Sequence, residues 1–273
     1  MNRWLSHSLL VFLFSACVAV PADYIVLEHR VVDASPVQSI FIQVDYGELT
    51  ILGSDETRVT VDGKALFDDE LEYMIDSTEE QIRIKVFVHR NSASNIPLQV
   101  VVQVPRQMQV EIETNDANVL ANDLLGNLEV ASTSGDITLE NMTGTMTLRS
   151  NRGNIAVRES EGIISIAGNY GGLTAQNVHG QIGISTIMGN ITLESLIQGG
   201  DTVRLETDHG AVSVNLGADS ALSLQVRSTS GDVACILPGV AASTRTCEGE
   251  IGFEGGSLSV RTVSGAVTLQ LIP

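Results

Sequence analysis

Lysine, aromatic residues and positive charge are all scarce in this sequence of 273 residues. Lys64 and Lys85 are its only lysines, and 15 basic residues face 33 acidic ones, which leaves a formal net charge of −18. A chain of this charge repels phosphate backbones and anionic lipid surfaces, so we expect no nucleic acid among its partners. Charged residues make up 18% of the chain and apolar residues 43%, with 25 glycines. These values are typical of a folded β protein with many turns.

Cysteine is also scarce, with three residues in the chain. Cys235 and Cys247 lie twelve positions apart, which is too far for a CxxC redox pair, and they lack the additional ligands of a metal site. In an exported protein we expect them to form a disulfide that closes the loop 236–246. The third cysteine, Cys17, belongs to the N-terminal segment.

Residues 1–22 have the features of a signal segment. Arg3 supplies a short positive region, and residues 5–16 are mostly apolar. An apolar run of this length is too short to span a bilayer, but it suits the central region of a signal peptide. We therefore expect the protein to be exported, to the periplasm, the cell surface or the extracellular space.

Two processing sites are compatible with this segment. The residues Phe-Ser-Ala-Cys at 14–17 resemble a lipobox, in which Cys17 becomes the lipidated first residue. Alternatively, the small residues at 20–22 allow ordinary cleavage before Asp23. In either case, contact with the membrane is limited to a possible N-terminal lipid anchor.

A glycine recurs every nine residues through the middle of the chain. Each opens the pattern G-x-h-x-h-x-x-x-x, in which h is an apolar residue. The spacing of the apolar pair places both side chains on one face of a short strand. The glycine is expected to end the strand in a tight turn with a positive φ. The eight glycines are Gly126, Gly135, Gly144, Gly153, Gly162, Gly171, Gly180 and Gly189.

Alternate glycines are of two kinds, which makes the true repeat eighteen residues long. Those of the first kind have Ser or Thr three positions earlier and are followed by Asp or Asn, residues that tolerate a left-handed conformation. The clear examples are Gly135-Asp136, Gly153-Asn154 and Gly189-Asn190. We predict an all-β fold, a β-solenoid (β-helix) with about 18 residues per coil, in which two short strands alternate with two glycine-containing corners.

Regularity is lost toward both ends of the repeat. Further strands open at Gly210, Gly231-Asp232 and Gly265, with insertions between them. We assign residues 113–273 to the regular solenoid. Residues 23–112 alternate apolar and polar side chains without a fixed period, which indicates irregular β coils or a cap, or alternatively a small separate β-sandwich.

The solenoid ends would expose unpaired strand edges. Pro273 cannot donate a ladder hydrogen bond, so we expect it to blunt one of these edges.

Several segments resemble a known family. They are the strand-like run LQVVVQVP at 98–105, the VEI at 110–112, and the Ser-Gly-Asp turns at 134–136 and 230–232. Over residues 36–272 the chain is similar to the bacterial "putative adhesin" family of unknown function, also called head-GIN or auto-transporter-adhesin-like. The resemblance implies an exported β-helical protein, and it supplies no binding residues that could be transferred.

The motifs of catalytic and metal sites are missing from the repeat. Calcium-binding nonapeptide rolls need Asp at the sixth position, where this chain places Arg149 and Arg158. Glycan-cleaving β-helices need converging carboxylates, whereas the outward positions here carry mostly small residues. The histidines lack metal-ligand spacing, and no phosphate-binding loop occurs. We therefore predict no catalytic, cofactor or metal site.

These observations favour an exported, non-enzymatic envelope or surface protein. It would be an adhesin-like binding or structural module whose partner is an unknown envelope protein or glycan. The alternative is an exported β-helical carbohydrate-active enzyme whose site is assembled from the irregular N-terminal half and loop acids.

Overall fold

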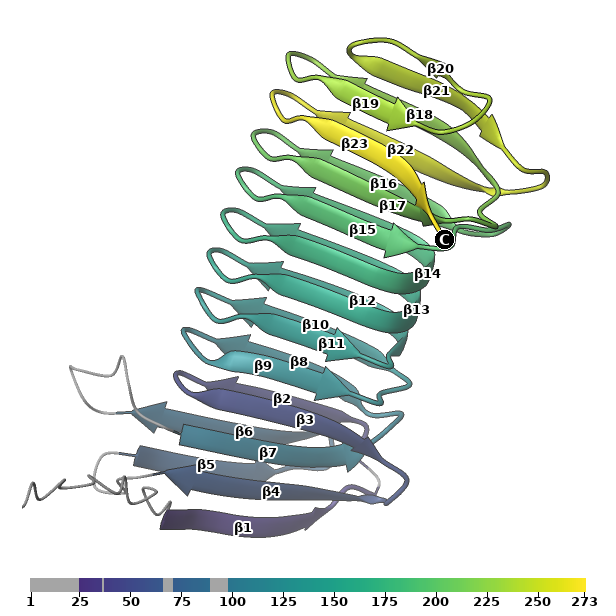
Figure 1. Cartoon of the computed structure of the whole chain (residues 1–273). Helices are drawn as coiled ribbons and strands as arrows, with labels where there is room; N and C mark the ends of the chain where they lie inside the picture. Colours follow the sequence, from purple (N-terminus) through teal and green to yellow (C-terminus); the bar gives the residue numbers. More distant parts are fainter. Residues whose placement is uncertain (1–24, 36, 66–70, 89–97) are drawn as a thin grey trace, which may run out of the picture.

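The computed structural model describes residues 25–35, 37–65, 71–88 and 98–273. Within these residues twenty-three strands join in one continuous sheet that winds into a stack of coils (Figure 1). The same residues include no helix long and apolar enough to cross a membrane. The expected signal segment, with Cys17, lies outside the described residues.

Each coil contributes one strand to each of two faces. Face A contains β2 (Ser39–Val44), β6 (Gln81–Val88), β8 (Gln109–Thr114), β10 (Asn127–Ser132), β12 (Thr143–Ser150), β16 (Thr202–Thr207), β18 (Leu222–Ser228) and β22 (Gly256–Thr262). Face B contains β3 (Glu48–Ser54), β7 (Leu98–Pro105), β9 (Asn118–Asn122), β11 (Ile137–Glu140), β15 (Ile191–Ser195), β17 (Val212–Gly217), β19 (Val233–Ile236) and β23 (Val267–Ile272). The long strands β13 (Ile155–Gly168) and β14 (Leu173–Thr186) bend at a corner and serve both faces.

The core is a set of apolar columns that run through the stack. Leu128 is in register with Met146, which is in turn in register with Ile164. The pairing is parallel with an eighteen-residue offset, so residues at the same repeat position lie above one another. All three side chains are buried. The predicted β-solenoid with its eighteen-residue repeat is confirmed.

At the N-terminal end, the order of strands in the stack differs from their order in the chain. β2 lies between β6 and β8, and β3 lies between β7 and β9, so the first coil of the chain is the second in the stack. Antiparallel strands extend this end: β4 (Arg58–Ala65) on β7, β1 (Ile25–Asp33) on β4, and β5 (Leu71–Ser77) on β6. These strands belong to the same sheet as the regular coils.

The C-terminal end has the same kind of exchange. β22 lies between β16 and β18, and β23 lies between β17 and β19. The outer end is completed by β20 (Ala241–Ala242) and β21 (Thr246–Ile251), with β21 antiparallel to β18. The expectation that Pro273 blunts an edge of the stack is wrong, because the strand before it is paired on both sides. Because of the same exchange, the Gly265 corner lies between the Gly210 and Gly231 corners in the stack, although Gly231 comes first in the chain.

The corner glycines are needed for two different reasons. Gly162 has a φ of +133°, as the turn argument predicted, and Gly144 and Gly180 are also in the positive region. Gly153 is not in that region. A Cβ on Gly153 would collide with the carbonyl oxygen of Gly135 in the preceding coil. For this kind of corner the expected positive φ is wrong, and close stacking of backbones is the reason for glycine.

The glycines at which an added Cβ would collide with the preceding coil in this way form one column through the stack. They are Gly135, Gly153, Gly171, Gly189, Gly210, Gly265 and Gly231. Gly126 begins the other column, below Gly144.

The predicted left-handed positions were also misplaced. Asp136, Asn154 and Asn190 do not have positive φ. Their side chains instead bond the next coil: the amide of Asn154 donates to Asp136 Oδ1 at 2.7 Å, and the amide of Ala211 donates to Asn190 Oδ1 at 2.9 Å. A carboxylate or amide oxygen at this position therefore satisfies a backbone donor that the strand ladder leaves free at the corner. Four of the described non-glycine residues with positive φ, Asp123, Asn141, Glu159 and Asn177, form a column at eighteen-residue spacing, and Glu254 is a fifth outside this column.

Candidate functional site

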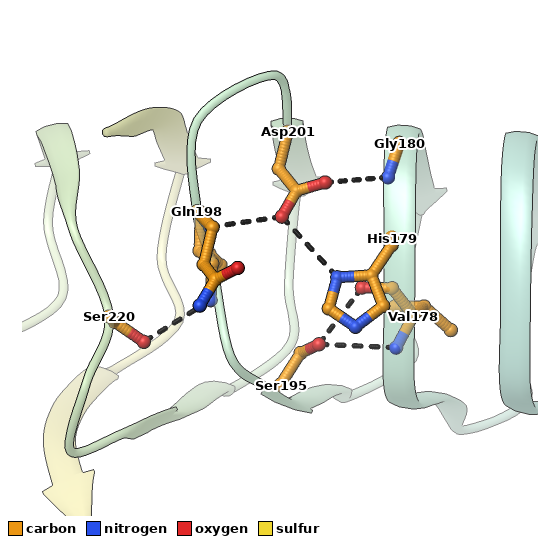
Figure 2. Close-up of polar contacts among 8 residues, drawn as sticks. Val178, His179, Gly180, Ser195, Gln198, Asp201 and Ser220 are labelled. Atoms are coloured by element: carbon orange, nitrogen blue, oxygen red, sulfur yellow. Dashed lines mark hydrogen bonds and ion pairs between the residues drawn. The ribbon is translucent and has the colours of Figure 1, made fainter. Parts of the chain in front are cut away.

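A buried carboxylate marks the corner between β15 and β16, where an insertion interrupts the repeat (Figure 2). Asp201 accepts hydrogen bonds from the backbone amides of Gly180 at 2.8 Å and Gln198 at 3.0 Å. His179 Nδ1 lies 3.4 Å from Asp201 Oδ2. The Asp201 side chain is only 10% exposed, so the two amide donors replace the water that a carboxylate would otherwise bind.

Ser195 lies beside this pair and suggests a Ser-His-Asp triad. Its hydroxyl, however, donates to the carbonyl of Val178 at 2.9 Å and accepts from the amide of the same residue at 3.1 Å. Ser195 is buried, and among the described residues no hydrogen bond joins it to His179 (Figure 2). A nucleophile needs its hydroxyl bonded to the base and open to substrate. This cluster is therefore a corner brace.

Three hollows of about 250, 390 and 650 Å³ lie in a row along one edge of face A, where its strands enter the corners that carry the first kind of glycine. We call this row the corner groove. The second and third hollows share Glu206 and Arg261, and the coil that contains β12 separates the first hollow from the second. The first is lined by 113–115 and 131–133 with Gln43 and Asp45; the second by 167–169, 185–187 and 206–208 with Arg261 and Val263; the third by 227–229 and 259–262 with Arg204, Glu206, Gln225, Thr246 and Glu248. The hollows thus recur at equivalent repeat positions.

The floor of the corner groove is built by the repeat itself. A buried Ser or Thr ends most of the strands at this edge and accepts a hydrogen bond from the backbone amide three residues later. Ser150 accepts from Gly153 at 2.9 Å, and Thr262 accepts from Gly265 at the same distance. These hydroxyls are occupied by the fold, so ligand contacts must come from the exposed residues on either side of them.

The first hollow contains two carboxylates, Asp45 and Glu113. Burial raises the pKa of Asp45 above its ordinary value of 3.8, and the hydrogen bond from Asn115 Nδ2, at 3.0 Å, partly opposes this rise. A carboxylate in such surroundings holds its proton to higher pH than an exposed one.

The second hollow adjoins an exposed apolar surface at the corner tips. Ile187 and Val263 line the hollow. Tyr170 and Met188, at the tips of neighbouring coils, are 61% and 54% exposed. Large apolar side chains exposed together in this way are typical of contact surfaces.

The third hollow is rich in arginine. Arg204, Arg227 and Arg261 line it, together with Glu206 and Glu248. Its local balance is therefore positive, in contrast to the net charge of −18 of the whole chain. A further hollow of about 490 Å³ lies near Met108 and Gly126, at the opposite edge of face A.

The remaining predicted residues line none of the three hollows. Cys235 and Cys247 form a disulfide with an S–S distance of 2.05 Å that connects β19 to β21. Asp232 lies at the last corner, where its carbonyl accepts from the amide of Val267 at 2.9 Å. Among the described residues no group of three or more His, Cys, Asp or Glu side chains is suited to hold a metal ion.

Sequence reasoning missed the corner groove. Its arginines belong to strands that the chain order does not place together, because β22 inserts between β16 and β18. The register aligns Arg227 with Arg261, although they are 34 positions apart in the sequence. No eighteen-residue spacing reveals this pairing.

Comparison with known proteins identifies relatives by family and by fold. A family model described as Toastrack DUF4097 matches residues 37–270. A protein described as a "putative adhesin" from Parabacteroides distasonis ATCC 8503 has a similar structure, with a TM-score of 0.52, 12% identity, and coverage of 91% of this chain and 98% of that one. A "putative cell adhesion protein" from Clostridium sporogenes ATCC 15579 has a TM-score of 0.33 and 12% identity, with 92% and 100% of the two chains covered. The search of curated proteins gave no match.

These matches confirm the resemblance inferred from residues 98–105 and from the Ser-Gly-Asp turns. The family model covers most of the chain, and the distasonis structure shares its fold. The chain belongs to the Toastrack DUF4097 family.

Proposed function

We propose that this protein is an exported, non-enzymatic surface module that binds a glycan chain along the corner groove. The observation that carries the proposal is the recurrence of the three hollows at equivalent repeat positions. Successive coils lie about 4.8 Å apart, so the three hollows form a row along the stack, each with its own set of side chains. A linear polymer that can contact more than one hollow is the ligand class that suits such a row.

The chemistry of the lining supports a glycan. Asn115, Asn169 and Ser185 offer amide and hydroxyl groups, and the exposed Tyr170 adds an aromatic surface at the corner tip. Sugar hydroxyls bond to the former, and the apolar faces of sugar rings pack on the latter. A peptide that adds as a strand needs a free sheet edge, and β16 and β22 are each paired on both sides.

Two features support export. The Cys235–Cys247 disulfide belongs to a class of bond that persists in oxidising compartments. The expected signal segment agrees with such a location, as either a lipoprotein modified at Cys17 or a cleaved soluble form. Intact mass after expression in a bacterial host, with Cys17→Ser as the control, distinguishes the two forms.

A glycan array with the full chain tests the proposal. A bulky side chain at exposed Ser185 fills the second hollow, so Ser185→Tyr should abolish binding. Thr192→Tyr adds the same group to face B, away from the groove, and should leave binding unchanged. Equal binding by both variants, or no glycan bound by the parent chain, would refute the proposal.

A carbohydrate-active enzyme is the second candidate, because Asp45 and Glu113 share the first hollow and the pKa of Asp45 is raised. A raised pKa suits a general acid in glycoside cleavage. In that case the chain releases new reducing ends from the glycans it binds, and both Asp45→Asn and Glu113→Gln abolish this release. Binding without turnover removes this candidate.

A further inference from the structure

The arginines of the third hollow come from three adjacent strands of face A. Arg204 belongs to β16, Arg261 to β22 and Arg227 to β18. Arg261 lies in register with Glu206 on one side and with Arg227 on the other. Outward side chains on neighbouring strands at the same register position point in the same direction. The three guanidinium groups therefore border one open hollow.

Two of these arginines are already paired. Arg204 Nη2 lies 2.7 Å from Glu206 Oε1, and Arg227 Nη2 lies 3.2 Å from Glu248 Oε1. Arg261 is exposed, and within the part of the chain that the structure describes it makes no ion pair or side-chain hydrogen bond. Among the described residues the guanidinium of Arg261 therefore has no ionic partner, and its two register neighbours, Glu206 and Arg227, are each paired with another residue.

Arg261 also connects two parts of the corner groove, because it lines both the second and the third hollow. It shares the lining of the second hollow with Ile187 and Val263, which border the apolar corner surface. A ligand that contacts Arg261 can thus extend along the groove in either direction.

We propose that this end of the groove binds the anionic groups of an acidic polysaccharide, with Arg261 as the residue that contacts a carboxylate or sulfate. The inference rests on the proposed function and specifies its ligand class. A guanidinium presents two parallel N–H donors that match the two oxygens of such a group. The negative charge of the remaining surface disfavours contact of a polyanion elsewhere, so its anionic groups bind at this end of the groove.

The test compares three polysaccharides by titration calorimetry with the full chain: polygalacturonate, dextran sulfate and neutral dextran. At least one of the anionic polymers should bind, and dextran should bind at least about tenfold more weakly. Arg261→Gln should weaken anionic binding about tenfold or more, because it removes a charge-assisted bidentate contact. A preference between the two anionic polymers identifies the carboxylate or the sulfate as the recognised group.

Arg149→Gln is the matched control. Arg149 occupies the same repeat position on face A, but it is paired with Glu129 at 2.8 Å and lines none of the three hollows. The substitution makes the same change in net charge, and it should alter binding by no more than about twofold, since exposed ion pairs contribute little.

Three outcomes would overturn the inference. Equal losses in Arg261→Gln and Arg149→Gln would mean that only the overall charge matters. Dextran binding that Ser185→Tyr abolishes and Arg261→Gln leaves intact would reject the acidic ligand but retain the proposed function. Failure of all three polymers to bind, while the parent chain binds other glycans on the array, would reject the acidic ligand alone; no binding in either experiment would reject both proposals.

Discussion

At the scale of the single residue, the stack depends on positions where two backbones approach closely. Gly153 lacks a side chain because the carbonyl oxygen of Gly135 occupies the place of a Cβ. Gly183, on the outer side of β14, has no atom within 4 Å of the corresponding position. Gly153 belongs to the repeating corner glycines and Gly183 does not, and their surroundings differ accordingly.

Gly153→Ala should therefore destabilise the protein, and Gly183→Ala should not. We expect the first substitution to lower the free energy of unfolding by roughly 1–3 kcal/mol, the usual cost of overpacking. The second should change it little, or raise it by up to about 1 kcal/mol through reduced freedom of the unfolded chain. Urea unfolding measures both; similar losses in the two variants would contradict the steric explanation.

The raised pKa of Asp45 predicts a pH dependence of stability. The folded state holds the Asp45 proton more tightly than the unfolded state, so this residue lowers stability as pH rises above its ordinary pKa of 3.8. Asp45→Asn keeps an oxygen that can accept from Asn115 and carries no charge. The variant should be more stable than the parent at pH 7, and this difference should shrink as pH falls toward 3.8 and below.

Melting temperatures of both proteins across this pH range check the prediction. Asp219→Asn, at an exposed carboxylate, controls for the change in net charge. An advantage of Asp45→Asn that persists unchanged at low pH would show that the carboxylate is not its cause.

At the scale of the element, the irregular corners need polar groups to replace the repeat. The insertion before β16 removes the regular glycine corner, and Asp201 instead accepts from the amides of Gly180 and Gln198. Ser220 similarly accepts from the amide of Ile197 at 3.2 Å. Each such group satisfies a backbone donor that would otherwise be buried without a partner.

Asp201→Ala should leave two donors unsatisfied and cost about 1–3 kcal/mol in the free energy of unfolding. Asp208→Ala, at an exposed position of a neighbouring corner, should change it by less than about 0.5 kcal/mol. Chemical denaturation of the two variants provides the comparison. If both variants behave like the parent chain, Asp201 is not a brace.

The sequence predicted the elements well and the corner chemistry less well. The apolar pairs identified strands and the eighteen-residue coil, because burial alternates strictly along a strand. Asp136 and Asn154 were recognised as corner residues, but their side chains bond the next coil instead of supporting a left-handed turn. The turn preference of a residue depends on its own backbone conformation and contains no information on how closely two coils stack. Turn preferences alone therefore could not distinguish a left-handed turn residue from one whose side chain bonds the next coil.

At the scale of the whole molecule, the order of coils in the stack differs from their order in the chain at both ends. The sequence does not reveal this exchange, because every strand carries a similar alternating pattern and any of them could pair with any other. The candidate groove was missed for the same reason: Arg261 reaches Arg227 and Glu206 only through the inserted position of β22.

Hydrogen exchange should follow position in the stack rather than position in the chain. Strands paired on both sides open less readily than strands at an end. The amides of β22 and β23, although they are the last strands of the chain, should therefore exchange more slowly than those of β19 and β20. Faster exchange at residues 256–272 than at 233–242 would contradict the insertion.

The insertion of β22 and β23 also bears on how the molecule is made. A ribosome synthesises the chain from its N-terminus, so β18 to β21 emerge before the two strands that separate them from the finished coils. These strands are synthesised before the coil that separates them from β16 and β17, so the edge of β17 stays unpaired until about the last eighteen residues have been synthesised. A chain cut short near its end would therefore lack an internal coil rather than a terminal one. Its unpaired edges would distinguish it from a completed chain for any protease or chaperone that recognises exposed strands.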